Sequence, residues 1–229
     1  MSCVVGIDGC KGAWITVSMT MGDRSLKWEK HRFVADVLDG SPDIAAVGID
    51  IPIGLPENGA RICDLMARRL LGKRGSSVFP APIRGVLGAR DYRHACDIRS
   101  KMEGKKMSQQ SWAIVPKTAE VDSLLRQRPE LRSLLYEVHP EVSFYFMGGS
   151  KPNTYSKKEK SGIDERIRKL SDSFRINHQY ISVTRHQHRV SEDDVVDALA
   201  ALWSAVRVFR RENIVLREDS DTGGPGIYA

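Results

Sequence analysis

The chain has 229 residues, of which 41% are hydrophobic and 28% are charged, and it carries a net charge of +6. This length and composition are typical of one elaborated globular domain, so we treat residues 1–229 as a single unit. No stretch approaches the roughly 18 consecutive apolar residues of a membrane-spanning helix. Met1–Gly6 lacks the basic start of a signal peptide, and the four cysteines form no C-x-x-C pair. We therefore expect a cytoplasmic protein outside the membrane.

The first fifty residues predict short strands joined by glycine-containing turns. A short helix is expected over Val34–Asp39. Ile44–Ile51 is strongly apolar with one charged residue, Asp50, which favours a central strand covered on both faces. Together with that run, the expected strands are Cys3–Asp8, Trp14–Met19 and Leu26–Phe33.

From residue 60 the apolar spacing changes to that of helices, and residues 61–130 are expected to form a basic helical insertion. Gly72–Ser77 predicts a loop, and Lys151–Gly162 predicts a polar surface loop. The expected helices run from Ile62 to Gly72, around 88–102, around 117–127 and over Ile163–Phe174. Leu134–Val138 predicts a buried strand and Ile181–Thr184 a weak one.

The last predicted helix is the best defined. Ser191 is a suitable N-cap, followed by acidic residues in the first turn. An apolar stripe follows at spacings of three and four residues: Val195, Leu199, Leu202, Val206 and Phe209. Residues 219–229 are rich in glycine and are expected to form a mobile tail, although Ile227-Tyr228 could dock.

The charge is segregated along the chain. Residues 61–117 hold 13 basic and 4 acidic side chains, a net charge of +9. Residues 1–60 have a net charge of −3, and residues 191–229 have a net charge of −4. A basic middle segment indicates a polyanionic partner, and the alternative is a set of solvated helix faces.

Several carboxylates lie at the ends of expected buried strands, positions that a protein with a purely structural role would not give to charged residues. Asp8, Asp50 and Glu137 lie at or near the ends of expected buried strands, and the last helix carries Asp194 and Asp197 at i, i+3. Carboxylates that converge repel one another unless a cation lies between them, and Mg²⁺ prefers such oxygen ligands. The alternatives are structural. Asp8 could serve a turn, Asp193 and Asp194 could complement the helix dipole, and Asp193 could pair with Asp197 at i, i+4. Glu137 could pair with a basic residue of the middle segment.

Several motifs together resemble the domain-of-unknown-function family 429, regarded as predicted nucleases with an RNase H-like fold. The resemblance covers residues 4 to about 205, nearly the whole chain. The main motifs are Gly6–Gly12, Asp50–Pro56, Arg61–Asp64, Ala67-Arg68, Leu71-Gly72, Tyr136–Glu141 and Asp193–Ala198. Lesser echoes are Gln110, Lys117–Asp122, Ser156–Lys158, Gly162 and Arg166.

This resemblance implies an α/β fold with a mixed five-stranded sheet, flanking helices and a helical insertion in the middle. The final motif is similar to that of RuvC-type resolvases, in which both helix acids belong to the metal site. By that resemblance Asp8, Asp50, Asp194 and Asp197 would hold two Mg²⁺ or Mn²⁺ ions and hydrolyse phosphodiester bonds. Glu137 would be an accessory ligand or a base.

A nuclease would use the basic segment to contact its substrate, DNA or RNA. Arg61, Arg68 and Arg74 are expected to contact phosphates, with Gln110 and Lys117 at the edge of the site. A homodimer is left open. The rival functions are an ATP-binding phosphotransferase of the same fold and a non-catalytic nucleic-acid-binding module.

Overall fold

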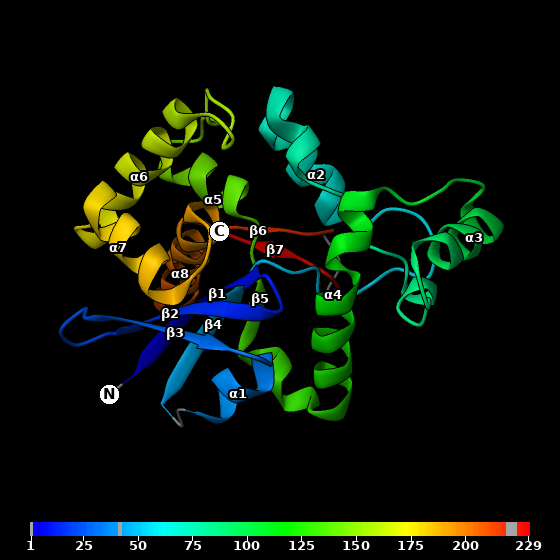
Figure 1. Ribbon diagram of the computed structural model, residues 1–229, viewed down its shortest axis with the longest axis horizontal. Coiled ribbons are helices and arrows are strands. Elements are labelled where there is room, and N and C mark those ends of the chain that lie inside the picture. Colours follow the sequence, from blue (N-terminus) through cyan, green and yellow to red (C-terminus); the bar gives the residue numbers. More distant parts are fainter. Residues whose placement is uncertain (1, 41–42, 219–223) are drawn as a thin grey trace.

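The computed structural model describes residues 2–40, 43–218 and 224–229 and centres on a five-stranded sheet (Figure 1). The sheet order is β3-β2-β1-β4-β5. Strands β1 to β3 form an antiparallel meander, whereas β4 and β5 run parallel to β1. This arrangement confirms the predicted RNase H-like α/β fold. The strands are β1 (Cys3–Cys10), β2 (Ala13–Thr20), β3 (Leu26–His31), β4 (Ile44–Ile49) and β5 (Leu135–Glu137).

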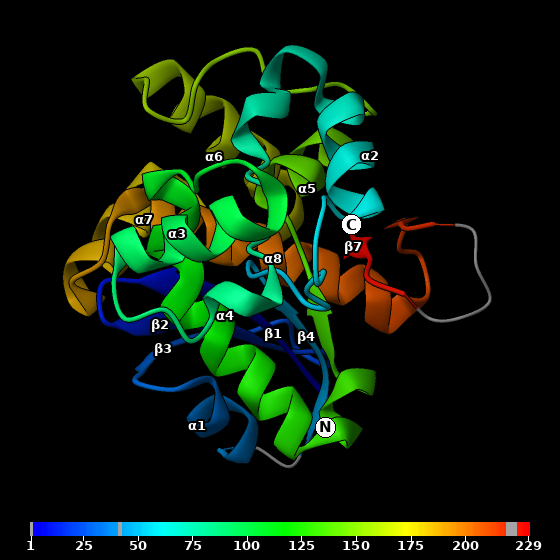
Figure 2. The ribbon, with the colours of Figure 1, turned by 90° about the vertical axis from the view of Figure 1, so that its right-hand side faces the viewer.

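Helices cover both faces of this sheet. On one face, α8 packs with α5, α6 and α7 over Val4 of β1. On the other face, α1 and α4 cover Val5 and Ile7 of the same strand, because successive side chains of a strand point to opposite faces. Figures 1 and 2 show α1 and α4 on the side of the sheet away from α8. These helices are α1 (Val34–Asp39), α4 (Gln109–Gln127), α5 (Pro140–Met147), α6 (Lys160–Phe174), α7 (His178–His188) and α8 (Glu192–Arg210).

Two glycines let α8 lie directly against the central strands. A Cβ built on Gly6 of β1 would lie 2.3 Å from the Ala198 carbonyl oxygen, and one on Gly48 of β4 would lie 2.4 Å from that of Ala201. Real Cβ atoms do not approach backbone that closely, so larger residues would push the helix away. Glycine on the strands and alanine on the helix therefore bring the first turns of α8 to the carboxyl ends of β1 and β4.

The predicted helical insertion lies between β4 and β5. Its N-terminal helix, α2, ends as predicted at Gly72, whose φ of +52° lies in the region that favours glycine. Gly72–Ser77 is a 3₁₀ helix, η1, and not the predicted loop. The insertion comprises α2 (Ile62–Leu71), η1, η2 (Arg84–Val86), α3 (Tyr92–Glu103) and α4, and η3 (Pro129–Ser133) leads into β5.

Two segments differ from the expected secondary structure. The predicted weak strand at Ile181–Thr184 is wrong, since these residues lie in α7. Asn177 caps that helix by accepting a hydrogen bond from the Tyr180 N–H at 2.9 Å, and Ile181 and Thr184 share its buried face at helical spacing. Helix α5 was not predicted, although Pro140 at its first position is a typical helix start.

The end of the chain docks on the main sheet. β7 (Ile227–Tyr228) pairs with β6 (Val215–Leu216), and Tyr228 also forms a parallel bridge with Val138 beyond β5. Ile227 and Ala229 are buried, so this end is not the mobile tail we expected. Residues 219–223 of that predicted tail lie outside the described residues. Among the described helices, none combines the length and apolar character needed to cross a membrane.

Candidate active site

The carboxyl ends of β1 and β4 place two aspartates side by side. Ile7 and Ile49 are partners in the parallel ladder, and the Asp50 N–H donates to the Ile7 carbonyl at 3.1 Å. Asp8 and Asp50 directly follow these partners, as the topology predicts. Asp8 is only 8% exposed although it is charged at neutral pH in water.

Helix α8 adds a third carboxylate, Asp197, which is 5% exposed. The Asp194 side chain instead caps its own helix, because its Oδ2 accepts from the Ser191 N–H at 2.9 Å and Ser191 Oγ accepts from the Asp194 N–H at 3.0 Å. Asp193, rather than Asp194, shares a cation with Asp197. Of the two acids predicted on this helix, Asp197 therefore belongs to the core of the cluster and Asp194 lies at its edge.

The three central carboxylates destabilise one another's ionised forms. Burial, followed by the charges of Asp197 and Asp50, raises the pKa of Asp8 well above its ordinary value. Burial and the charge of Asp197 raise the pKa of Asp50 to about 8. Burial raises the pKa of Asp197 to about 6, although Lys157 lowers it. Such a cluster binds protons, or a metal cation in their place.

Lys157 brings a cation to this cluster, and its only mark in the sequence is its place in the lesser motif Ser156–Lys158. Its Nζ lies 2.8 Å from Asp193 Oδ2 and 2.9 Å from Asp197 Oδ2. Burial disfavours the ammonium form, but the charges of Asp197 and Asp193 outweigh burial and raise the pKa of Lys157 above its ordinary value. The segment before α6, predicted as a polar surface loop, therefore contributes directly to the site.

The donor set suits a hard divalent ion in chemistry. Asp193 Oδ1 and Asp197 Oδ1 are buried and have no hydrogen-bond partner in the described part of the chain. Carboxylate oxygens are the ligands that Mg²⁺ and Mn²⁺ prefer. Within residues 2–40, 43–218 and 224–229, however, no three His, Cys, Asp or Glu side chains are already arranged as a metal-binding group. The residues therefore fit the ion by kind, and Asp8, Asp50 and Asp197 would have to close around it.

Glu137 is engaged elsewhere. Both of its oxygens accept from Arg61, at 2.6 and 2.7 Å, and one also accepts from the Ile53 N–H at 2.7 Å. Arg61 is 5% exposed and also pairs with Asp64. The guanidinium that was expected to contact phosphates is therefore buried between two carboxylates, and its donors are directed to them. Glu137 lines the same cavity as Asp50, with its oxygens turned to this arginine.

The other predicted substrate contacts fall into two groups. Lys117 lies at the edge of the site, where its Nζ donates to the Ala13 carbonyl at 2.5 Å and lies 4.0 Å from the centre of the Trp14 ring. A Cβ on Gly9 would lie 2.7 Å from the Lys117 side chain, so this glycine makes room for it. Arg68 and Gln110 are exposed on α2 and α4, and neither lines the cavity that Asp50 and Asp197 line.

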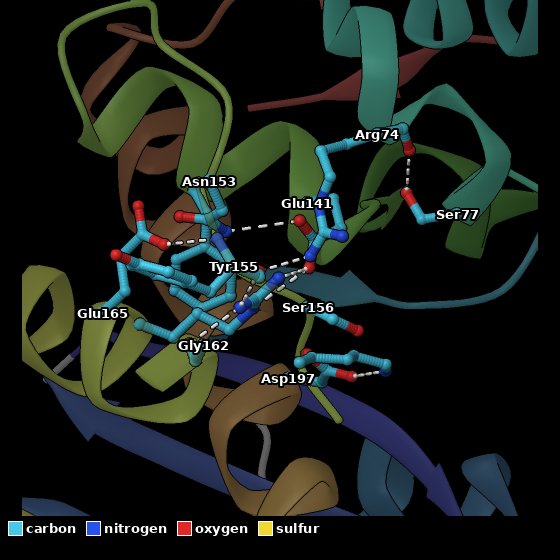
Figure 3. Close-up of polar contacts among 12 residues, drawn as sticks. Arg74, Ser77, Glu141, Asn153, Tyr155, Ser156, Gly162, Glu165 and Asp197 are labelled. Carbon is cyan, nitrogen blue, oxygen red and sulfur yellow. Dashed lines mark hydrogen bonds and ion pairs between the residues drawn. The ribbon is translucent and has the colours of Figure 1, made fainter. Parts of the chain in front are cut away.

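A cavity of about 430 Å³ opens beside the cluster. Asp50, Asp197 and Lys157 line one part of it, and Arg74 and Phe79 line another. Arg74 also donates to the Tyr155 carbonyl, which joins η1 to the segment that carries Lys157 (Figure 3). The volume lies within the range of small-ligand sites, about 300–1,000 Å³.

The strand order, the strand-end aspartates and the acid on the last helix define an α/β protein of the RNase H-like class. A family model described as a protein of unknown function, DUF429, matches residues 6–222. The chain belongs to this family. A search of curated proteins and a search of solved structures found no match.

Proposed function

We propose that the protein is a metal-dependent nuclease that hydrolyses phosphodiester bonds in DNA or RNA. The observation that carries this proposal is the convergence of Asp8, Asp50 and Asp197 from β1, the end of β4 and α8. All three carry a raised pKa, and the buried Oδ1 of Asp197 has no hydrogen-bond partner among the described residues. An arrangement that serves stability alone would pair such groups.

In this proposal Asp8, Asp50 and Asp197 hold Mg²⁺ or Mn²⁺. The bound ion supplies Lewis-acid polarisation of the phosphate and lowers the pKa of water. The protein supplies the fixed carboxylates, and Gly6 and Gly48 keep the acid on α8 next to those at the strand ends. Burial of the cluster strengthens its attraction for a cation, because electrostatic interactions are less screened there.

The surroundings of the cluster suit a phosphodiester. Arg74 and Lys158 line the cavity beside Asp50 and Asp197, and Lys117 lies near Asp8 on the other side. Cations in these positions would contact phosphates without selecting a base. Phe79 also lines the cavity and is 44% exposed, so its ring is available for stacking on a base.

The proposal is tested by cleavage of branched, single-stranded and RNA–DNA hybrid substrates with Mg²⁺ or Mn²⁺. We expect Asp8→Asn and Asp197→Asn to lose roughly 100-fold or more of the activity, at or above the effect of losing an outer-shell partner of a metal. Asp172→Asn, at an exposed position on α6, is the matched control and should retain it. Activity that survives both site substitutions, or cleavage of none of the substrates, would rule the proposal out. Phosphate release from ATP on the same samples tests the phosphotransferase alternative.

A further inference from the structure

The ammonium of Lys157 occupies a position that a second metal ion would need. It bridges Asp193 and Asp197, one turn apart on α8, at 2.8 and 2.9 Å. We propose that Lys157 permanently takes one of the two cation positions, so that the chain binds a single divalent ion beside it. This inference rests on the proposed nuclease function and replaces the two ions implied by the resemblance to RuvC-type enzymes.

The two carboxylate oxygens of Asp197 differ in their contacts, as a site shared between an ammonium and a metal ion requires. Its Oδ2 accepts from Lys157, and its Oδ1 is buried with no partner among the described residues. In two-metal sites the ions lie about 4 Å apart, a separation that one carboxylate can bridge with its two oxygens. Asp197 therefore holds the ammonium with one oxygen, and its other oxygen would be available, together with Asp8 and Asp50, to one divalent ion.

The segment that carries Lys157 is fixed against α6 by hydrogen bonds and close packing. Thr154 and Tyr155, just before it, donate their N–H groups to Glu165 of α6 at 2.9 and 3.2 Å (Figure 3). A Cβ on Gly162 would lie 1.8 Å from the Ser156 carbonyl oxygen, so only glycine allows the segment to lie this close to α6. The backbone on the N-terminal side of Lys157 is thus fixed against a helix.

A buried ion pair anchors the same support. Arg166 is fully buried and Glu141 is 5% exposed, and the Arg166 Nε donates to Glu141 Oε1 at 3.0 Å. The other Glu141 oxygen accepts from Asn153 Nδ2 at 3.2 Å. Figure 3 shows these groups converging from α5, α6 and the segment between them. Side chains locked in this way hold a functional group in place before its ligand arrives.

The alternative is an ordinary ion pair. Exposed pairs contribute about 0–1 kcal/mol and are screened by salt. In this pair, however, the acceptor Asp197 is 5% exposed and belongs to the central cluster. Lys157 also has a further N–H donor, since Asp193 and Asp197 are its two acceptors within the described residues. That donor can contact a phosphate oxygen of the substrate, a role in which a lysine replaces a metal ion.

The experiment counts the ions bound per chain. Mn²⁺ is titrated into the full chain, with binding followed by calorimetry and by the loss of the electron paramagnetic resonance signal of free Mn²⁺. We expect one Mn²⁺ per chain for the wild type and two for Lys157→Met, which keeps most of the length of the side chain and removes its charge. Lys160→Met is the matched control, because Lys160 is exposed at the start of α6 and forms no ion pair among the described residues, and it should bind one ion.

Two ions in the wild type, or an unchanged count in a folded Lys157→Met, would overturn the inference. Circular dichroism establishes folding, and Lys157→Gln provides a second variant if the methionine variant does not fold. Cleavage assays on the same samples separate the two proposals. A wild type that binds two ions and cleaves refutes the role of Lys157 and supports a nuclease. Counts of one and two with no cleavage support the role of Lys157 and refute the nuclease. Absence of Mn²⁺ binding refutes both.

Discussion

Two acidic clusters lie beside one cavity, and in only one of them does every carboxylate oxygen have a hydrogen-bond donor within the described residues. Around Arg61, the carboxylates of Glu137 and Asp64 receive its guanidinium donors at 2.5 to 3.2 Å. Both oxygens of Asp64 are engaged, since the Ala81 N–H also donates to Oδ2 at 3.1 Å. This cluster has the chemistry of a structural element: every charge has a partner, and no ligand is required.

The second cluster, Asp8, Asp50 and Asp197, lacks such a partner at its centre. Among the described residues, the cation that forms ion pairs with this cluster is Lys157, which contacts Asp197 and shares its charge with Asp193. The comparison separates two uses of the same residue types. Burial raises the pKa of Glu137 as well, so the clusters differ in their hydrogen bonds: acids that receive a full set of donors stabilise the fold, whereas acids with unpartnered buried oxygens are prepared for a ligand.

The largest expected effect is on the stability that the cluster around Arg61 provides. Arg61→Met leaves two buried carboxylates without their guanidinium, and removing one partner of a buried pair destabilises a protein by about 3–5 kcal/mol. Urea unfolding of the metal-free protein measures this loss. Arg68→Met, at an exposed position in the same helix, is the control and should stay within about 0.5 kcal/mol of the wild type. Equal effects of the two substitutions would remove the distinction between the clusters.

Addition of a metal should stabilise the protein through the cluster of Asp8, Asp50 and Asp197. Mg²⁺ or Mn²⁺ at about 100 times its Kd should raise the free energy of unfolding by about 2.7 kcal/mol, because it binds the folded state alone. Asp50→Asn removes a ligand and should lose most of this gain, while Asp172→Asn should keep it. Thermal unfolding with and without EDTA gives the comparison. A gain retained in full by Asp50→Asn would remove that residue from the ligand set.

The pH dependence of the metal-free protein should be smaller and has a definite sign. The folded protein keeps Asp50 protonated up to its pKa of about 8, whereas the unfolded chain loses that proton near pH 4. Stability therefore falls as the pH rises from 7 to 8.5, by about 1 kcal/mol, the equivalent of one pKa unit. His139, whose pKa is lowered by burial, acts in the opposite sense only below its ordinary value of 6.5.

Urea unfolding in EDTA at pH 7 and pH 8.5 measures this fall. Asp50→Asn has no proton to lose and should show a shallower dependence than the wild type. Saturating Mg²⁺ should also reduce the fall, because an ion that holds the carboxylates ionised removes their excess protons. A wild type whose stability rises over this range would contradict the raised pKa of Asp50.

The sequence predicts those parts of the structure that are determined by residues close together in the chain. Alternating and apolar runs mark the strands, and Ser191 with Asp194 marks the start of α8, where both form the capping box. That same cap explains why the two predicted acids of α8 differ in position. An acid in the first turn can serve its own helix, so Asp194 lies at the edge of the cluster and Asp197, one turn later, lies at its centre.

The particular partners in contacts between distant segments could not be predicted in this way, although a pair between Glu137 and some basic residue of the middle segment was among the expected alternatives. Arg61 belongs to a basic stretch, and its partner Glu137 lies 76 residues further along the chain. Lys157 lies 40 residues before Asp197 in a segment with the composition of a solvated loop. Its position depends on the packing of α5 against α6, and α5 itself was not predicted. The local sequence pattern thus identified the acids, whereas the cations that pair with them are brought close only by the tertiary structure.

The smallest expected effect concerns another arginine of the basic segment, Arg74. Arg74 donates to the neutral carbonyl of Tyr155, and its guanidinium has no carboxylate partner among the described residues, in contrast to Arg61. A phosphate can therefore supply the missing negative charge. Arg74→Ala should weaken nucleic-acid binding similarly for all sequences and lower the slope of log affinity against log salt by about 1.

Arg24→Ala is the matched control for this substitution, because Arg24 also donates to a backbone carbonyl, that of Ser173, at 2.7 Å and lies in the turn between β2 and β3. Fluorescence anisotropy with a labelled oligonucleotide, in EDTA to prevent cleavage, measures both variants over a range of salt. If Arg24→Ala changes the slope as much as Arg74→Ala, binding is a property of the overall charge. If Arg74→Ala alone changes it, an arginine without a carboxylate partner marks the path of the substrate, just as the carboxylates without partners mark the place of the metal.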